Sequence, residues 1–309
     1  MILAHNNPRH LERLVDKLRH SNCQIFIHID KASDIEQFKR ITYSNVEFVK
    51  NRVSVYWGGF SLTQATLNLL EYAINKTDCH RFQLLSGVDY PIKPISKLES
   101  FLSNNDKMEF ITLNSIIDEQ SALFFRISRP HLIDSKVTNP KTRGDYIYIK
   151  SEVDELVNSV LESTIKKLHL ERIDNLTRKF RIYKGSNWFN LSREAAQYCI
   201  DFIKYNNDFL DAFRFTECSD EMFFHTIIGN SRFCERVCKN FEHKKANAEH
   251  KLFSGLHYVN WNSRPAPKTF TEIEELDELV SSQAFFARKF NEQSLDVLDA
   301  IDLKILNLS

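Results

Sequence analysis

Short apolar runs alternate with segments of helical periodicity through the first 115 residues, and this alternation restricts the folds that the chain can adopt. Strand-like runs lie at residues 1–5, 24–29, 46–49, 81–86 and 109–113. After the first run, Asn7 can cap a helix whose first position suits Pro8. Ser61 and Gln64 form a capping-box pattern before a second helix. This βαβ alternation is typical of a largely parallel, buried sheet, so we expect an α/β fold.

The middle of the chain, residues 116–180, is polar and irregular apart from an amphipathic helix predicted near residues 153–170. We expect this middle segment to be an insertion or a lid. Regular structure resumes with a helix near 193–205, a strand within 255–261 and a last helix near 294–306. No internal repeat or low-complexity linker divides the chain, so a single domain over residues 1–309 is predicted.

Composition and charge narrow the class of protein further. With 42% apolar residues and only seven Gly and seven Pro, the chain can bury a large core. Lys plus Arg and Asp plus Glu both total 41, and no dense basic run marks a groove for nucleic acid. The six cysteines lack a zinc-binding pattern, which predicts reduced thiols. The apolar start soon turns polar, so we expect a cytoplasmic protein without a signal peptide or membrane span.

Several catalytic motifs are missing. The seven glycines form neither G-x-G-x-x-G nor a P-loop, and no H-E-x-x-H or G-x-S-x-G occurs. There is no D-x-D triplet, with which many nucleotide-sugar transferases hold a divalent metal on the diphosphate. Glu221 and His225 are four residues apart, but two candidate ligands are a weak metal signal. A satisfied, partly buried histidine explains His225 better.

The segment CSDEMFFHTIIG, residues 218–229, places two acids before an apolar run. On its own it is typical of a helix start, with Ser219 as N-cap and with Asp220 and Glu221 favoured by the helix dipole. A catalytic carboxylate would look the same within this segment. Both interpretations stay open until the rest of the chain is considered.

Seven short strings, taken in order, resemble one family of glycosyltransferases. They are IFIHIDKAS, VYWGGFSL, FQLLSGVDYPIKP, GSNWF, EMFFHT, VNWN and FFARKF. The family holds the core-2/I-branching β-1,6-N-acetylglucosaminyltransferases and the peptide O-xylosyltransferases, and the resemblance is weakest over residues 116–180. It implies a GT-A-like fold, a UDP-sugar donor, inversion at the anomeric carbon and no metal or other cofactor. It also implies that residues 1–115 bind the nucleotide and that residues 181–309 bind the acceptor and the diphosphate.

The resemblance assigns roles to four residues. Glu221 matches the catalytic base, which takes the proton of the acceptor hydroxyl as that oxygen attacks C1. Asp30 matches an aspartate at the nucleoside. Arg288 and Lys289 match basic residues that hold the donor diphosphate in the xylosyltransferase branch, where two cations stabilise the charge of the departing UDP. Asp220 has no match and keeps the helix-terminus role.

Four further residues are secondary candidates. His257 stands where the family usually carries an arginine near the diphosphate, so either His257 binds as a weaker cation, Arg264 substitutes for it, or activity is low. Asn187 stands where the xylosyltransferases carry an aspartate facing the acceptor, which argues for a different acceptor. Trp188 is either a sugar-stacking platform or a core residue. Asp89 either faces the donor sugar or organises its loop.

The sequence therefore predicts an inverting, metal-independent transferase that moves N-acetylglucosamine from UDP to a hydroxyl of a glycan or a lipid-linked oligosaccharide. We expect a bacterial enzyme of cell-surface polysaccharide synthesis that works in the cytoplasm and can associate with the inner face of the membrane. One alternative is UDP-xylose or another UDP-sugar as donor in the same fold. Another is a catalytically silent carbohydrate- or nucleotide-binding protein, which the unusual His257 suggests.

Overall fold

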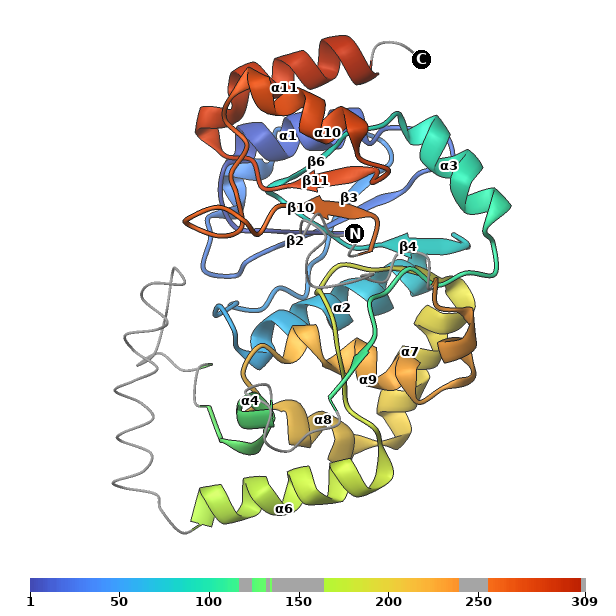
Figure 1. Cartoon of the computed structure of the whole chain (residues 1–309), viewed down its shortest axis with the longest axis vertical. Helices are drawn as coiled ribbons and strands as arrows, with labels where there is room; N and C mark the ends of the chain where they lie inside the picture. Colours follow the sequence, from blue (N-terminus) through green and yellow to red (C-terminus); the bar gives the residue numbers. More distant parts are fainter. Residues whose placement is uncertain (117–123, 132–133, 135–163, 239–254, 307–309) are drawn as a thin grey trace.

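The computed structural model describes residues 1–116, 124–131, 134, 164–238 and 255–306 of the 309-residue chain (Figure 1). The strands are β1 (Ile2–Ala4), β2 (Ile25–Ile29), β3 (Val46–Phe48), β4 (Arg81–Gln83), β5 (Leu85–Ser86), β6 (Asp89–Pro91), β7 (Asn114–Ser115), β8 (Tyr183–Lys184), β9 (Asn190–Ser192), β10 (His257–Val259) and β11 (Phe286–Arg288). The α-helices are α1 (Pro8–Lys17), α2 (Phe60–Lys76), α3 (Ile95–Asn104), α4 (Phe124–Ser128), α6 (Thr164–Lys179), α7 (Arg193–Tyr205), α8 (Asn207–Phe213), α9 (Phe223–Gly229), α10 (Leu276–Ser281) and α11 (Leu295–Ile301). Short 3-10 helices lie at Ile35–Phe38, Ser219–Glu221, Arg232–Arg236, Ile273–Glu275 and Glu292–Ser294, and a π-helical turn lies at Asp302–Leu306.

A four-stranded parallel sheet, in the order β3-β2-β1-β5, forms the centre of the molecule. Ile2 of β1 lies opposite Ile27 of β2 on one side and opposite Leu85 of β5 on the other. The chain thus extends the sheet from β1 through β2 and β3, and later adds β5 on the opposite side. Open α/β sheets bind ligands at the carboxyl ends of the two strands between which the order reverses. Here these strands are β1 and β5.

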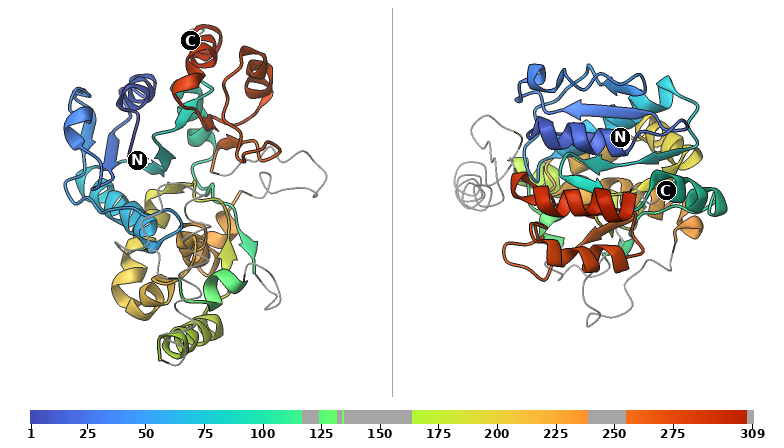
Figure 2. Two further views of the ribbon diagram at one scale, coloured as in Figure 1. Left: turned by 90° about the vertical axis from the view of Figure 1, so that its left-hand side faces the viewer. Right: turned by 90° about the horizontal axis from the view of Figure 1, so that it is seen from above.

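Alternating side chains on β1 explain why helices cover both faces of this sheet. Ile2 and Ala4 belong to the same apolar core as the buried residues of α1, whereas Met1 and Leu3 belong to a second core with α2. The two helices lie on opposite faces of the sheet (Figures 1 and 2). Each fully buried apolar side chain contributes about 1.5–3 kcal/mol, so the period of two along the strand dictates the layers. The predicted α/β fold, with a parallel sheet between helices as in GT-A-like proteins, is confirmed.

A smaller mixed sheet has the strand order β10-β11-β6. β10 runs parallel to β11, and β11 runs antiparallel to β6, with Arg288 directly opposite Asp89. β6 follows β5 after only Gly87 and Val88, so the carboxyl end of the central sheet leads directly into the smaller one. Phe290 donates its backbone N–H to the Val88 carbonyl at 2.8 Å, which fixes the residues after β11 against this connection.

Two predicted strands differ from the structure. Residues 81–86 form two short strands, because the pairing partner changes at Leu84: β4 pairs with β9, and β5 pairs with β1. Residues 109–113 form only isolated bridges, to Val237 and to Asn190. This segment contacts two separate parts of the chain, so no continuous ladder of hydrogen bonds develops along it.

The first turn of α2 shows how a distant residue replaces a local cap. The predicted capping box of Ser61 and Gln64 is wrong, because the helix begins at Phe60 and Ser61 lies inside its first turn. The Asp134 carboxylate accepts from the Ser61 N–H at 2.8 Å and from the Ser61 hydroxyl at 2.6 Å. A carboxylate 73 residues away therefore satisfies this helix terminus and matches its dipole. By contrast, Asn7 caps α1 as predicted.

Other expectations from the sequence can be compared with the structure directly. Helix α7 has the predicted ends, Arg193 and Tyr205. Most of the helix predicted near 153–170, and of the lid expected over 116–180, lies outside the described residues, and the single domain remains a prediction. All six cysteines are free thiols, as expected. None of the described helices is both long and apolar enough to cross a lipid bilayer.

Candidate active site

Asp30 lies directly after β2, at the carboxyl edge of the central sheet. Its Oδ1 accepts from the backbone N–H groups of Ala32 at 2.8 Å and Val55 at 3.3 Å. Arg52 holds the same turn by donating to three of its carbonyl groups at 2.6–2.8 Å. Asp30 thus organises the turn through Oδ1, while its Oδ2 makes no hydrogen bond within the described residues and can accept from a ligand.

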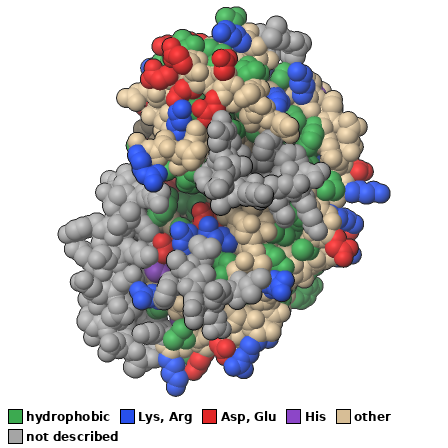
Figure 3. All heavy atoms as spheres, viewed as in Figure 1, with side chains coloured by type: hydrophobic (Ala, Val, Ile, Leu, Met, Phe, Trp, Pro, Cys, Tyr) green, Lys and Arg blue, Asp and Glu red, His purple; other side chains and the backbone are tan. Residues whose placement is uncertain are grey.

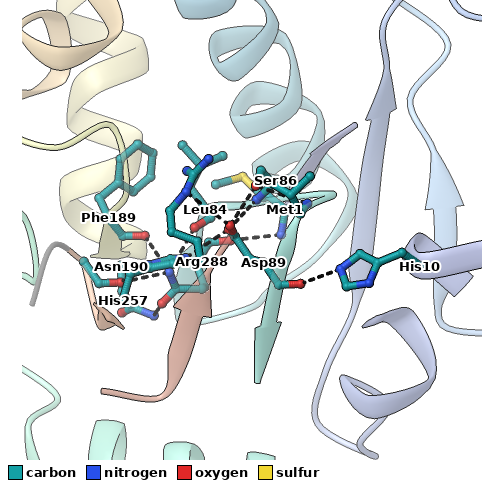
Figure 4. Close-up of polar contacts among 12 residues, drawn as sticks. Met1, His10, Leu84, Ser86, Asp89, Phe189, Asn190, His257 and Arg288 are labelled. Carbon is teal, nitrogen blue, oxygen red and sulfur yellow. Dashed lines mark hydrogen bonds and ion pairs between the residues drawn. The ribbon is translucent and has the colours of Figure 1, made fainter. Parts of the chain in front are cut away.

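Asp89, Trp188, His257 and Arg288 form a group that we call the Asp89 cluster (Figure 4 labels three of them). The Asp89 carboxylate accepts from the Ser86 N–H and hydroxyl, both at 2.7 Å, and lies 3.1 Å from His257 Nε2 and 3.7 Å from Arg288 Nε. The Arg288 guanidinium lies 4.2 Å from the centroid of the Trp188 ring. Burial opposes ionisation of Asp89, but the charge of Arg288 and the contacts with His257 and Ser86 outweigh it, so the pKa of Asp89 is lowered.

The members of this cluster differ in how much of each side chain is exposed. The side chains of Asp89 and His257 are fully buried, whereas 17% of the Arg288 side chain is exposed. Asp89 organises its loop through Ser86, and the donor contacts expected of Asp89 and His257 stay predictions. Trp188 is buried against Arg288, and its role as a sugar-stacking platform stays a prediction.

Lys289 follows Arg288 and is only partly buried. Its N–H donates to the Lys268 carbonyl at 3.2 Å, and its carbonyl accepts from Phe270 at 3.1 Å, so its backbone is held in place. Its ammonium group makes no ion pair with any described residue. Burial and the charge of Arg288 lower the pKa of Lys289, because both disfavour the ammonium form. A bound anion would relieve this repulsion, so Arg288 and Lys289 form a candidate anion site.

Glu221 lies between two cations, Arg126 of α4 and Lys184 of β8, and these three residues form the Glu221 cluster. Arg126 Nη1 at 3.0 Å and Lys184 Nζ at 2.9 Å both contact the same oxygen, Oε2. The other oxygen, Oε1, makes no such contact within the described residues. The Glu221 side chain is 30% exposed, and its backbone carbonyl accepts from Gly185 at 2.9 Å. One carboxylate oxygen is thus held, and the other is available to a bound hydroxyl.

The backbone before Glu221 is not a simple helix start. Cys218 has a left-handed φ of 51°, a 3-10 turn covers Ser219–Glu221, and α9 begins only afterwards. Ser219 is not the predicted N-cap, because its hydroxyl pairs with the Thr63 hydroxyl at 2.8 Å. Asp220 does lie in the first turn, but it is buried. Burial and the charge of Glu221 raise the pKa of Asp220 to about 7.

Five consecutive residues connect the two clusters. Lys184 belongs to the Glu221 cluster and Trp188 to the Asp89 cluster, so their Cα atoms are at most about 14 Å apart. Gly185 is required between them, because a Cβ there would lie 2.1 Å from the Thr112 carbonyl oxygen. Basic side chains with acidic neighbours gather in a recess halfway along the face shown in Figure 3. The two clusters are thus held at the two ends of one short segment.

Sequence reasoning missed Arg126 and Lys184. Lys184 directly precedes the GSNWF string, which could have indicated it, whereas Arg126 lies where the family resemblance is weakest.

Asn187 is buried, and its Oδ1 has no hydrogen-bond partner among the described residues. His225 has Nε2 2.8 Å from the Ser186 carbonyl, but it is fully buried rather than partly buried, its Nδ1 has no hydrogen-bond partner among the described residues, and burial lowers its pKa to about 3. The described part of the chain holds no group of three or more His, Cys, Asp or Glu residues that could bind a metal ion.

Comparisons with known proteins identify relatives along nearly the whole chain. It is 26% identical to xylosyltransferase 1 of Rattus norvegicus over 317 residues, which cover 94% of this chain and 34% of that protein. It is 27% identical to xylosyltransferase 2 of Homo sapiens over 324 residues, covering 97% and 33%. A xylosyltransferase of Ciona intestinalis is 26% identical over 326 residues, covering 99% and 34%. The chain spans about a third of the length of these relatives.

The model of the Core-2/I-branching enzyme family matches residues 1–280. The matched range includes Asp89, Glu221 and His257 and ends shortly before Arg288. The resemblance that the strings carry is thereby confirmed at the level of the family. This chain belongs to the Core-2/I-branching enzyme family.

Proposed function

We propose that this chain is an inverting transferase that moves a sugar from a UDP-sugar to a hydroxyl of its acceptor. The observation that carries the proposal is the placement of Glu221 beside Lys184 and of Arg288 over Trp188, at the two ends of the five-residue segment 184–188, with Lys289 directly after Arg288. Inverting transfer needs a base at the acceptor and positive charge at the leaving group. Membership of the family supports the reaction class.

In this mechanism Glu221 acts on the acceptor. Its Oε1 takes the proton of the attacking hydroxyl while that oxygen forms a bond to C1 of the donor sugar. The bond from C1 to the diphosphate oxygen breaks, its electron pair leaves with UDP, and the configuration at C1 inverts. Arg126 and Lys184 hold Oε2 and so orient the carboxylate. Such a positioned base accelerates proton transfer by roughly 10²–10⁴-fold.

Arg288 and Lys289 act on the leaving group. Their charges lie at the end of β11, next to the connection between β5 and β6, where the carboxyl edge of the central sheet presents the donor site. They stabilise the charge that develops on the diphosphate, a task that a divalent metal performs in other transferases. We therefore propose a reaction that needs neither a metal nor another cofactor. Asp30 contributes Oδ2 as an acceptor for the nucleoside.

The donor sugar is a separate question. The relatives named above are xylosyltransferases, and the Arg288 and Lys289 pair matches that branch of the family. These two observations favour UDP-xylose. UDP-N-acetylglucosamine, which the sequence analysis put first, stays as the alternative donor.

The acceptor and the cellular role rest on the sequence alone. A glycan or a lipid-linked oligosaccharide provides the hydroxyl in this proposal. The transfer would take place in the cytoplasm, at the inner face of the membrane. Its product would be a precursor of cell-surface polysaccharide. The unpartnered Oδ1 of Asn187 is a candidate acceptor for one of its hydroxyl groups.

A panel of UDP-sugars tests the proposal. The purified chain is incubated with UDP-xylose, UDP-N-acetylglucosamine, UDP-glucose or UDP-galactose and a mixture of hydroxyl acceptors, with and without EDTA, and released UDP is measured. We expect turnover with one donor, an unchanged rate in EDTA and a product of inverted anomeric configuration by NMR. Retention of configuration would contradict the mechanism, and so would EDTA inactivation that Mn²⁺ reverses. UDP binding without turnover of any donor would instead support the silent binding protein.

A further inference from the structure

His257 is the residue of the Asp89 cluster whose hydrogen bonds restrict its charge. Its Nδ1 lies 3.0 Å from the Gly255 carbonyl oxygen, and its Nε2 lies 3.1 Å from Asp89 Oδ2 (Figure 4). A carbonyl oxygen can only accept, so Nδ1 must carry a proton. A neutral imidazole with that tautomer would point the lone pair of Nε2 at a carboxylate.

A proton on Asp89 would remove the repulsion between the Nε2 lone pair and the carboxylate, but the contacts of Asp89 favour its ionised form. Its Oδ2 already accepts from the Ser86 N–H, and its Oδ1 accepts from the Ser86 hydroxyl, both contacts that favour the ionised form. Gly255 holds the arrangement at the other nitrogen. It has a φ of +57°, and a Cβ there would lie 2.2 Å from the Trp188 carbonyl oxygen. The geometry therefore requires protons on both nitrogens of His257, which makes the ring an imidazolium.

This imidazolium has a consequence for charge. The charged groups that face His257 within the described residues are Asp89 of β6 and, at the other oxygen of that carboxylate, Arg288 of β11. Without the charge of His257, the Asp89 carboxylate would neutralise Arg288. With it, one carboxylate faces two cations, and the buried cluster keeps one net positive charge.

We propose that His257 is a positioning residue: a buried imidazolium that neutralises Asp89 and so leaves the charge of Arg288 available to the donor diphosphate. This inference rests on the proposed function for the identity of the anion alone. His257 itself has no exposed surface and does not touch the ligand. His257 and Arg288 contact opposite oxygens of the same carboxylate, so His257 acts on Arg288 through Asp89.

The protonation state is tested on the ligand-free protein. The chain is labelled with ¹⁵N-histidine, and the ring nitrogens of His257 are observed by long-range ¹H–¹⁵N NMR at neutral pH. The signal is assigned through its contacts with the Trp188 and Phe286 rings, which lie 5.3 and 5.4 Å from the His257 ring centroid, so no variant is needed. We expect both nitrogens to be protonated. One unprotonated nitrogen would overturn the inference and would leave the proposed function untouched.

The effect on the ligand is tested with UDP itself by titration calorimetry. His257→Gln should bind UDP roughly 10-fold more weakly, since one charge near the diphosphate is lost. The double variant His257→Gln/Asp89→Asn removes the cation and its carboxylate together, so it should regain most of the lost affinity. His169→Gln changes another buried histidine, away from the cluster, and should bind UDP normally. Weak binding by the double variant as well, or normal binding by His257→Gln, would contradict the account. Absence of UDP binding by the wild-type chain would refute the proposed function instead.

Discussion

The Asp89 and Glu221 clusters have the same charges and opposite exposure. Each places one carboxylate between two basic groups: His257 and Arg288 around Asp89, and Arg126 and Lys184 around Glu221. The Asp89 side chain is fully buried, whereas the Glu221 side chain is 30% exposed. Exposure to solvent, rather than the number of charged partners, therefore distinguishes a carboxylate that positions neighbouring side chains from one that can react with a substrate.

The physical reason lies in desolvation. A buried carboxylate has lost its water and depends on its partners, so its oxygens are fully used in the native structure. Asp89 accepts from Ser86 and His257 and lies beside Arg288. Glu221 keeps part of its hydration and has both cations on one oxygen. Its other oxygen can exchange water for a substrate hydroxyl without breaking either ion pair.

Replacing Glu221 should have the largest effect on activity. Glu221→Gln keeps the size of the side chain and removes the base, so kcat should fall by roughly 10²–10⁴-fold. UDP affinity and the thermal midpoint should change little. Rates are measured as UDP release under saturating donor and acceptor. Glu194→Gln is a matched control, since Glu194 also lies between two arginines, Arg232 and Arg236, and its side chain is 49% exposed. Unchanged turnover in Glu221→Gln would remove Glu221 from the mechanism.

The corresponding change in the buried cluster should affect folding instead. Asp89→Asn leaves His257 and Arg288 without their counter-ion, which should lower the free energy of unfolding by about 3–5 kcal/mol. Urea denaturation measures the loss. Asp299→Asn provides the control, because Asp299 pairs with Arg13 at the exposed surface and should matter little for stability. Equal stability of Asp89→Asn and the wild type would show that the contrast between the clusters is wrong.

Lys289 tests the cation side of the comparison. Lys289→Ala removes an ammonium group that has no counter-ion among the described residues, so folding should be preserved while kcat falls by roughly 10²–10³-fold. Stopped assays of UDP release measure kcat, and urea denaturation measures the free energy of unfolding. Lys204→Ala, at an exposed helix end where Lys204 pairs with Asp201, is the control. A variant that turns over normally would contradict the role of Lys289 at the leaving group.

Asp220 should have an effect on stability that depends on pH. Its pKa is about 7 in the folded chain against 3.8 for a free side chain, so the native state binds more protons than the unfolded state between these values. Stability should therefore decline as pH rises from about 4 to 7, with a contribution of up to about 1.4 kcal/mol per pH unit.

Asp220→Asn should remove this decline. Urea midpoints at several pH values between 5 and 8 provide the comparison. Asp211→Asn, an exposed aspartate paired with Arg214, should leave the profile as it is. If the wild type and Asp220→Asn showed parallel profiles, Asp220 would not be the titrating group.

The sequence predicted features that depend on neighbouring residues. Asn7 and Pro8 start α1 as expected, and α7 runs between the predicted residues, because caps and helical periodicity act within one turn. The parallel sheet followed from the same kind of local pattern. The role of Glu221 could not be predicted from its own segment, since only the other family strings distinguished it from Asp220.

Features that depend on distant residues escaped prediction. Asp134 caps α2 from 73 positions away, and Ser219 pairs with Thr63 across 156 positions. Arg126 reaches Glu221 across 95 positions, from a segment where the family strings give no guidance. Burial had the same limit, because nothing in the residues around His257 indicated that its side chain would be fully buried.

A crystal structure with bound UDP tests the central claim most directly. The account predicts that the phosphates lie against Arg288 and Lys289, that the nucleoside contacts Asp30, and that Oε1 of Glu221 faces the open space beyond the β-phosphate. Asp89 and His257 should remain buried and should not touch the nucleotide. Phosphates bound elsewhere, or a Glu221 side chain turned away from the space beside them, would contradict the proposed active site.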